Sequence, residues 1–220
     1  MNNPCPICKS KKITLIWNNK IRNGKNKGTK EKKKIFKCKN CDAGFLEKRH
    51  KILNNNKIFR KKFDGSNSVT KFLSFNKPRE IEKIKKILKI YNISNKSILE
   101  SNCGAGVVLD YLKKNNKLTC GLDHKIYEHH VRKKHLFFSD LKQLKNSKIK
   151  FDVILSLSEI EHKYNPLKFI KIIKNFLNKN GVLIFRMPNY DNIYKYFLDE
   201  TFLKYDFRSS HNFYFSQKSA

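Results

Sequence analysis

The sequence of 220 residues lacks several features that would place it in a common class of proteins. No apolar run approaches the roughly 18 residues of a membrane-spanning helix, and the first ten residues lack the apolar core of a signal peptide. Internal repeats, a phosphate-binding P-loop and the nucleophile elbow of hydrolases are missing as well. These absences predict a soluble, cytoplasmic protein, and the length suits one domain with a small appendage.

Acidic residues and arginine are also scarce. The chain has 18 Asp and Glu against 49 Lys and Arg, a net charge of +31, yet only 7 of the basic residues are Arg. Lys, Asn and Ile are abundant and Ala is rare, which A/T-rich codons produce without any ligand. Because specific recognition of phosphates and guanine edges favours arginine's planar fork, we expect no specific nucleic-acid partner.

The charge is uneven along the chain. Residues 1–96 hold 28 basic and 6 acidic side chains, whereas residues 97–220 hold 21 and 12. A positive field of this kind attracts polyanions in general, including nucleotide-linked sugars, acidic glycans and RNA. It assists the approach of such molecules without identifying one of them.

Two CxxC pairs, Cys5 with Cys8 and Cys38 with Cys41, lie within residues 1–50. A two-residue gap lets both sulfurs of a pair reach one tetrahedral ion, so the four cysteines predict a zinc site. Four thiolates close the coordination shell, which indicates a structural zinc in a small ribbon whose folding depends on the metal. Two redox or merely buried pairs are the alternative.

Residues 51–96 are expected to connect this ribbon to the remainder of the chain. Turn-forming residues dominate the first part. Apolar side chains then recur at helical spacing at Ile81, Ile84, Ile87, Leu88 and Tyr91. The pattern predicts a helix that packs on the domain that follows.

Residues 97–220 alternate between strand-like and helical segments. Strands are expected at 97–101, 118–122, 135–138, 151–156 and 182–187. Helices are expected at 106–115, 125–134, 166–178 and 190–204. Such alternation predicts an α/β fold, a Rossmann-like parallel sheet with helices on both faces.

The first strand of this domain leads into a glycine-bearing turn. Residues 98–106 read Ile-Leu-Glu-Ser-Asn-Cys-Gly-Ala-Gly, and Asp123 follows directly after the second strand. Gly104 and Gly106 let the backbone approach a ligand closely, and an acid at a strand tip can accept both ribose hydroxyls. The arrangement predicts a nucleotide-binding βαβ unit.

These residues resemble the class I S-adenosylmethionine-dependent methyltransferases. The resemblance covers residues 97–215 and rests on the first-motif run just described, on GLD at 121–123, FSDL at 138–141, FDVILSLSEIEH at 151–162 and NGVLIFRMPN at 180–189. One departure is Asn102, which stands where the family has its first glycine. Since Asn adopts left-handed conformations more readily than most residues, the turn can survive. The family's sheet has seven strands, so its C-terminal strands are expected to be missing here.

The resemblance implies S-adenosylmethionine as cosubstrate and a set of residues that contact it. The set comprises Glu100, Asn102, Gly104 and Gly106 around the amino-acid part, Asp123 at the ribose, Asp140 and the backbone of Leu141 at the adenine, and Ser156 near the ammonium group. For Asp140 the alternative is a turn or a helix-capping acid.

Histidines near the expected ligand edge are candidates for the chemistry. Glu161 and His162 follow the fourth strand, and His211 lies in a segment that the family brings near the acceptor. Either histidine could deprotonate a hydroxyl acceptor, since an unperturbed imidazole has a pKa of about 6.5. The alternative is that Glu161 and His162 only order the loop. Four further histidines at 124, 129, 130 and 135 fit a solvated helix face better than a metal site.

The sequence thus predicts a zinc-ribbon methyltransferase with domains at 1–50, 51–96 and 97–220. Chains resembling it methylate small molecules, often sugars or nucleotide-sugars of surface polysaccharides. Two rival functions remain open. The basic front segment favours an RNA methyltransferase, whereas Asn102 and the short C-terminal part favour a degenerate binding module without turnover. The acceptor atom and the oligomeric state do not follow from the sequence.

Overall fold

The computed structural model describes residues 4–23, 27–51, 78, 80–194, 197 and 206–220. Its contacts divide the chain into two compact units that do not follow sequence order. The cysteine unit comprises Met1–Leu53, Ser158–Ile170 and Met187–Ala220, and the parallel-sheet unit comprises Asn54–Leu157 and Lys171–Arg186. The units cut across the three segments expected from the sequence, because residues 187–220 pack with the first fifty.

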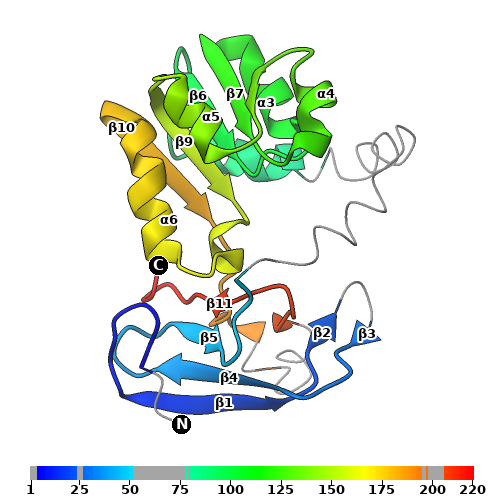
Figure 1. Cartoon of the computed structure of the whole chain (residues 1–220), viewed down its shortest axis with the longest axis vertical. Coiled ribbons are helices and arrows are strands. Elements are labelled where there is room, and N and C mark those ends of the chain that lie inside the picture. Colours follow the sequence, from blue (N-terminus) through cyan, green and yellow to red (C-terminus); the bar gives the residue numbers. More distant parts are fainter. Residues whose placement is uncertain (1–3, 24–26, 52–77, 79, 195–196, 198–205) are drawn as a thin grey trace. The chain divides into compact units, whose positions relative to one another are not determined.

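The parallel-sheet unit is built on five parallel strands (Figure 1). The strands are β6 (Ser97–Ser101), β7 (Leu118–Leu122), β8 (Leu136–Phe138), β9 (Phe151–Leu157) and β10 (Leu177–Arg186). Their spatial order is β10-β9-β6-β7-β8, so the direction of winding reverses between β6 and β9. Ligands of open α/β sheets bind at the carboxyl ends of the strands beside such a reversal. The register there places Ser101 next to Ser156.

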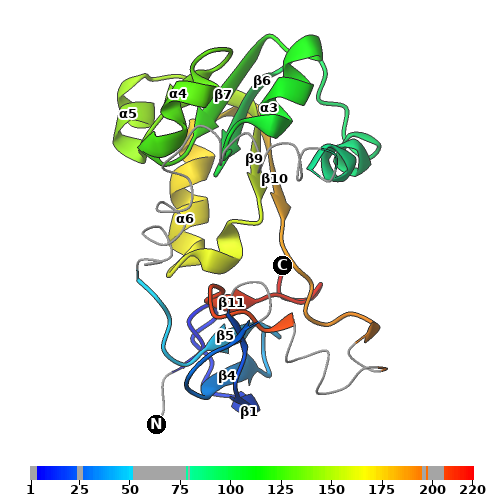
Figure 2. The ribbon, with the colours of Figure 1, turned by 90° about the vertical axis from the view of Figure 1, so that its right-hand side faces the viewer.

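Helices lie on both sides of this sheet (Figure 2). They are α3 (Val107–Leu112), α4 (Glu128–Val131), α5 (Leu141–Asn146) and α6 (Pro166–Ile173), with single 3-10 turns at Lys113–Asn115, Lys125–Tyr127 and Lys174–Phe176. Residues 80–88 are also helical, as the spacing of isoleucines predicts. Ile84 of that helix and Val108 of α3 pack against Ile98 and Val153 of the sheet. Alternate side chains of the strands point to this face of the sheet, and they bury the apolar sides of the two helices.

The structure differs from the expected elements at four places. The helix expected at 125–134 is a 3-10 turn at Lys125–Tyr127 followed by α4, which ends at Val131. The helix expected to reach residue 178 ends at Ile173, because Leu177 already pairs with Phe151 as the start of β10. Residues 178–181 form an irregularity inside β10 instead of a helix stop. Helix α5 was not expected from the sequence, although Asp140 caps it. The helix expected at 190–204 lies largely outside the described residues.

The cysteine unit contains a four-stranded sheet in the order β1-β4-β5-β11. Its strands are β1 (Ile13–Asn19), β4 (Lys33–Cys38), β5 (Gly44–Leu46) and β11 (Phe213–Tyr214), and all neighbours are antiparallel. A second ribbon pairs β2 (Arg22–Asn23) with β3 (Lys27–Gly28). The C-terminal aromatic segment thus completes the sheet that carries the cysteines. Within the described ranges the parallel sheet has five strands.

Within the described part of the chain, no helix has the length and apolar character needed to cross a membrane.

Candidate functional site

The turn after β6 has an unusual backbone. Asn102, Gly104 and Gly106 have φ angles of 62°, 53° and 79°, all in the left-handed region. The Asn102 angle confirms the expectation that this residue keeps the conformation usually given to glycine. A Cβ at Gly104 would meet no atom within 4 Å, so the space beside this glycine is open to a ligand. Gly106 then forms the N-cap of α3.

Asp123 holds this turn in place. Its Oδ2 accepts a hydrogen bond from the Gly104 amide at 2.7 Å, and its Oδ1 accepts one from the His124 amide at 2.5 Å. The Asn102 amide donates to the Leu122 carbonyl at 2.8 Å, which joins the turn to the end of β7. Asp123 therefore joins the turn after β6 to the end of β7.

Close packing under the turn explains a glycine within β7. A Cβ added at Gly121 would lie 2.6 Å from the Cys103 sulfur. Cys103 is buried in a small cluster with Leu109, Val131 and Phe137. Burial also raises the pKa of the Cys103 thiol well above its ordinary value, so the side chain is a packing group.

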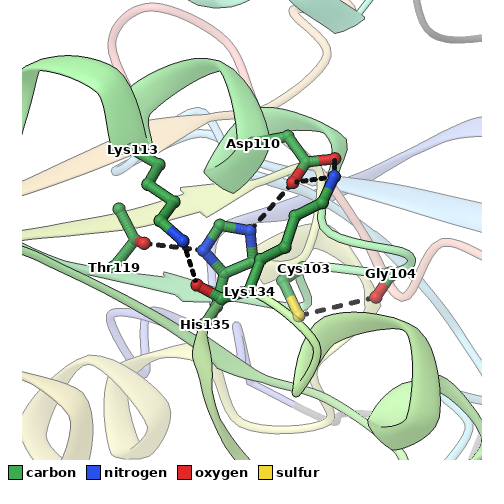
Figure 3. A network of polar contacts seen from close by, with 7 residues as sticks. All are labelled: Cys103, Gly104, Asp110, Lys113, Thr119, Lys134 and His135. Atoms are coloured by element: carbon green, nitrogen blue, oxygen red, sulfur yellow. Dashed lines mark hydrogen bonds and ion pairs between the residues drawn. The ribbon is translucent and has the colours of Figure 1, made fainter.

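A buried polar network fixes the helix behind the turn (Figure 3). His135 Nδ1 lies 2.7 Å from the Thr119 hydroxyl in β7, and its Nε2 lies 3.0 Å from Asp110 in α3. Lys134 also reaches Asp110, and Lys113 donates to the Lys134 carbonyl. Burial lowers the pKa of His135, although Asp110 opposes the shift. The network ties α3 to β7. The expectation that His135 lies on a solvated helix face is wrong, because its ring is buried between Thr119 and Asp110 and α4 ends at Val131.

The structure places the other expected cosubstrate residues at the same edge of the sheet. Glu100 and Ser156 are buried near the carboxyl ends of β6 and β9. Asp140 is exposed and accepts a hydrogen bond from the Gln143 amide at 2.8 Å as the N-cap of α5. Leu141 opens that helix. The capping role of Asp140 is thus observed, and its contact with an adenine stays a prediction.

Glu161, His162 and His211 come together in the cysteine unit. One candidate ligand atom of each lies within 4.8 Å of the others. His162 Nδ1 lies 2.8 Å from the Ser210 carbonyl, and because a carbonyl only accepts, this nitrogen carries the proton. Its Nε2 lies 3.9 Å from the Glu161 carboxylate. Burial lowers the pKa of His162 and holds that of His211 well below its usual range, aided by the charges of His162 and Arg208.

Asn212 holds this cluster together, and sequence reasoning did not single it out. The residue is fully buried. The backbone amide of Asn212 donates to the Glu161 carbonyl at 2.8 Å. The side-chain Nδ2 donates to the backbone carbonyls of His162 and His50 at 3.0 and 2.9 Å. The backbone amide of His50 in turn donates to Oδ1 of Asn212 at 2.7 Å. Three distant segments therefore meet at one side chain, which no local pattern in the sequence reveals.

The four cysteines of the two CxxC pairs converge as expected. Their sulfurs lie within 4.8 Å of one another, with Cys5 3.7 Å from Cys41 and Cys8 3.5 Å from Cys38. Tetrahedral zinc with bonds of about 2.3 Å separates its sulfurs by about 3.8 Å, and a disulfide would need about 2.05 Å. A hydrogen bond from Asn40 lowers the pKa of Cys8 to about 6, which favours a thiolate. The donor set fits zinc.

Comparison with protein-family models gives one match. A family model described as a methyltransferase domain matches residues 72–219. No curated protein matches the chain in sequence. Three similar solved structures are coclaurine N-methyltransferase bound to N-methylheliamine and SAH (19% identity, TM-score 0.41), an S-adenosylmethionine-dependent methyltransferase from Clostridium acetobutylicum (25%, 0.41) and the DhpI–SAM–HEP complex (13%, 0.48).

The aligned regions are partial. They cover 48%, 51% and 70% of this chain, and 35%, 49% and 74% of those three chains, respectively. The chain therefore spans about a third of the length of the first of these relatives and about half of the second.

Proposed function

Because the chain belongs to the methyltransferase-domain family, we propose that it transfers a methyl group from S-adenosylmethionine to a small-molecule acceptor. The observation that carries the proposal is the hydrogen bond from the Gly104 amide to Asp123. It joins a left-handed glycine turn to an acid at a neighbouring strand tip, at the reversal of a parallel sheet. That is the place and the chemistry expected for a nucleotide-linked ligand.

The residues present fit the cosubstrate. The open space beside Gly104 admits a ligand against the backbone, and Asp123 stands at a strand tip, where an acid can meet ribose hydroxyls. Glu100 and Ser156 supply buried polar groups at the adjoining strand ends, where an amino-acid moiety would lie. Asp140 and the Leu141 backbone would meet the adenine. S-adenosylmethionine, when bound, supplies the methyl group on a sulfonium that makes it electrophilic.

The work left to the protein is alignment, exclusion of water and removal of a proton from the acceptor. For a hydroxyl acceptor, we assign the proton removal to His162 or His211, with Glu161 beside them. The buried setting keeps both imidazoles neutral, and the Ser210 carbonyl holds the proton of His162 on Nδ1. His162 Nε2 is then free to accept a proton. Replacing each histidine with Gln should lower turnover and leave cosubstrate binding intact.

For the acceptor we propose a sugar or nucleotide-sugar of the kind used in surface polysaccharides. The proposal follows from the resemblance in sequence, and the positive field of the front segment supports an anionic, nucleotide-linked form. The same field is the one observation that favours the RNA methyltransferase. The left-handed Asn102, which keeps the turn intact, argues against the degenerate binding module.

Calorimetric titration with S-adenosylmethionine tests the proposal directly. We expect one cosubstrate per chain, followed by methyl transfer when nucleotide-sugars are supplied with radiolabelled cosubstrate. Absence of cosubstrate binding by correctly folded protein would contradict the methyltransferase function. Binding without transfer to any acceptor would favour the non-catalytic module, and transfer to RNA alone would favour the RNA enzyme.

A further inference from the structure

The cluster of Glu161, His162 and His211 combines two imidazoles and a carboxylate in a buried place. Glu161 is 1% exposed and His211 is 4% exposed. The rings of His162 and His211 meet edge to face, with centroids 4.8 Å apart. The three side chains come from a 3-10 turn at Ile160–His162 and from the residue two positions before β11.

We propose that Glu161, His162 and His211 bind one divalent transition-metal cation. Two histidines and one carboxylate are a ligand set for zinc, iron or cobalt, and three protein ligands leave coordination positions open. This site is separate from the four-cysteine cluster, whose ligands are all sulfur. The cation binding itself does not depend on the proposed methyl transfer.

The orientation of His162 suits a ligand. A metal-bound histidine usually donates its second ring N–H to a carbonyl or carboxylate, which fixes the tautomer. His162 Nδ1 donates in this way to the Ser210 carbonyl at 2.8 Å. Its Nε2 therefore presents a lone pair on the side of the Glu161 carboxylate, 3.9 Å away. The candidate ligand atom of His211 lies within 4.8 Å of those of Glu161 and His162.

Charge considerations agree with a cation. A cation bound here would meet the negative charge of Glu161, a carboxylate that is 1% exposed. The positive charges of Arg22 and Arg208 lower the pKa of His211, and the same charges would repel a cation held only by electrostatic attraction. The cation must therefore be held by direct bonds, and its affinity should depend little on salt.

The backbone around the cluster is already in place. Asn212 bonds to the main chain of both Glu161 and His162, so the two segments that supply the ligands are joined. Tetrahedral bonds of about 2.1 Å place ligand atoms about 3.4 Å apart. The three candidate ligand atoms already lie within 4.8 Å of one another. Where the proposed methyl transfer holds, a hydroxyl bound at an open position would have a lowered pKa and would release its proton to water.

The experiment uses the full chain with its cysteine cluster first loaded with zinc. Co²⁺ is then titrated and followed by its visible absorption. We expect one equivalent whose bands lack the intense thiolate charge-transfer absorption of a sulfur site. Glu161→Gln and His211→Gln should each weaken Co²⁺ binding at least tenfold, whereas the exposed His129→Gln serves as the matched control and should bind normally.

Two outcomes would overturn the site: no Co²⁺ binding beyond the cysteine cluster, or binding that survives both substitutions. Because either variant could misfold, a second measurement uses the unaltered protein. Bound Co²⁺ should shift the ring-proton resonances of two histidines, and unshifted histidines would contradict the proposal. S-adenosylmethionine titrations on the same samples separate the two ideas, since cosubstrate binding that persists without Co²⁺ binding rejects the metal site alone.

Discussion

Asp123 Oδ2 accepts a hydrogen bond from the backbone amide of Gly104 at 2.7 Å. The acid at the tip of β7 thus supports the turn after β6 as well as facing the ligand edge. Any change at Asp123 therefore acts on the turn geometry as well as on the proposed ligand contacts. A test of the residue must separate the two effects.

Asp123→Asn should lower affinity for S-adenosylmethionine at least tenfold. The change removes the charge that strengthens hydrogen bonds to ribose hydroxyls, worth about 1.5–3 kcal/mol each at most. Asp152→Asn is the matched control, since Asp152 also accepts a backbone amide, from Ser97 at 2.8 Å, but at the amino end of β9. Both variants should lose some stability in urea, and only Asp123→Asn should lose cosubstrate in calorimetry. Equal binding by the two would show that the acid does not contact the ligand.

Asn102 tests the backbone of the turn. Asn102→Val should cost about 1–2 kcal/mol of unfolding free energy, because a β-branched residue is strained at a φ of 62°. Asn102→Gly should keep or slightly raise stability. Asn95 is a matched control. It is exposed, has a φ of 57°, and precedes the amino end of β6, whereas Asn102 follows the carboxyl end. Asn95→Val should show a similar loss in urea unfolding yet normal cosubstrate binding, and a binding loss of equal size would contradict the role of the turn.

His135 predicts a dependence of stability on pH. Its pKa is lowered by burial, so below about pH 6.5 the unfolded chain binds more protons than the folded one. The corresponding stability is present above that pH and is lost as the pH falls through it. Unfolding in urea between pH 5 and 8 should show a smaller slope in His135→Gln, by at most about 1.4 kcal/mol per pH unit. Identical slopes would mean that His135 is readily protonated in the folded protein.

Much of the parallel-sheet unit could be predicted from the sequence, because its signals are local. Alternating apolar runs mark β6 and β7, and the glycines mark the turn between β6 and α3. Features that depend on distant partners could not be predicted. The end of α6 is set by the pairing of Leu177 with Phe151. The pairing of β11 with β5 and the hydrogen bonds between Asn212 and His50 join segments more than 150 residues apart.

The cysteine cluster should bind one sulfur-ligated zinc per chain. Metal analysis of protein made without a metal-binding tag should find it, and Cys41→Ser should lose it. Cys120→Ala is the control for the number of thiols, because Cys120 is buried in β7 and should leave the zinc in place. Removing the zinc should also destabilise the sheet that contains β4 and β5, since metal binding contributes directly to the folding of such small units. Disulfides between these cysteines would contradict the prediction.

The net charge of +31 should give only weak, sequence-independent binding to RNA or DNA. Lysine, a point charge on a flexible stem, supplies most of this charge, whereas specific readout of phosphates and guanine edges favours arginine. Binding by counterion release alone falls steeply between about 50 and 200 mM salt and is similar for every sequence. Gel-shift titrations of several unrelated RNAs, repeated at both salt concentrations, measure the two properties together. Specific nucleic-acid binding proteins prefer their site by roughly 10³-fold or more. A preference of that size for one RNA at physiological salt would support the RNA methyltransferase instead of the small-molecule enzyme.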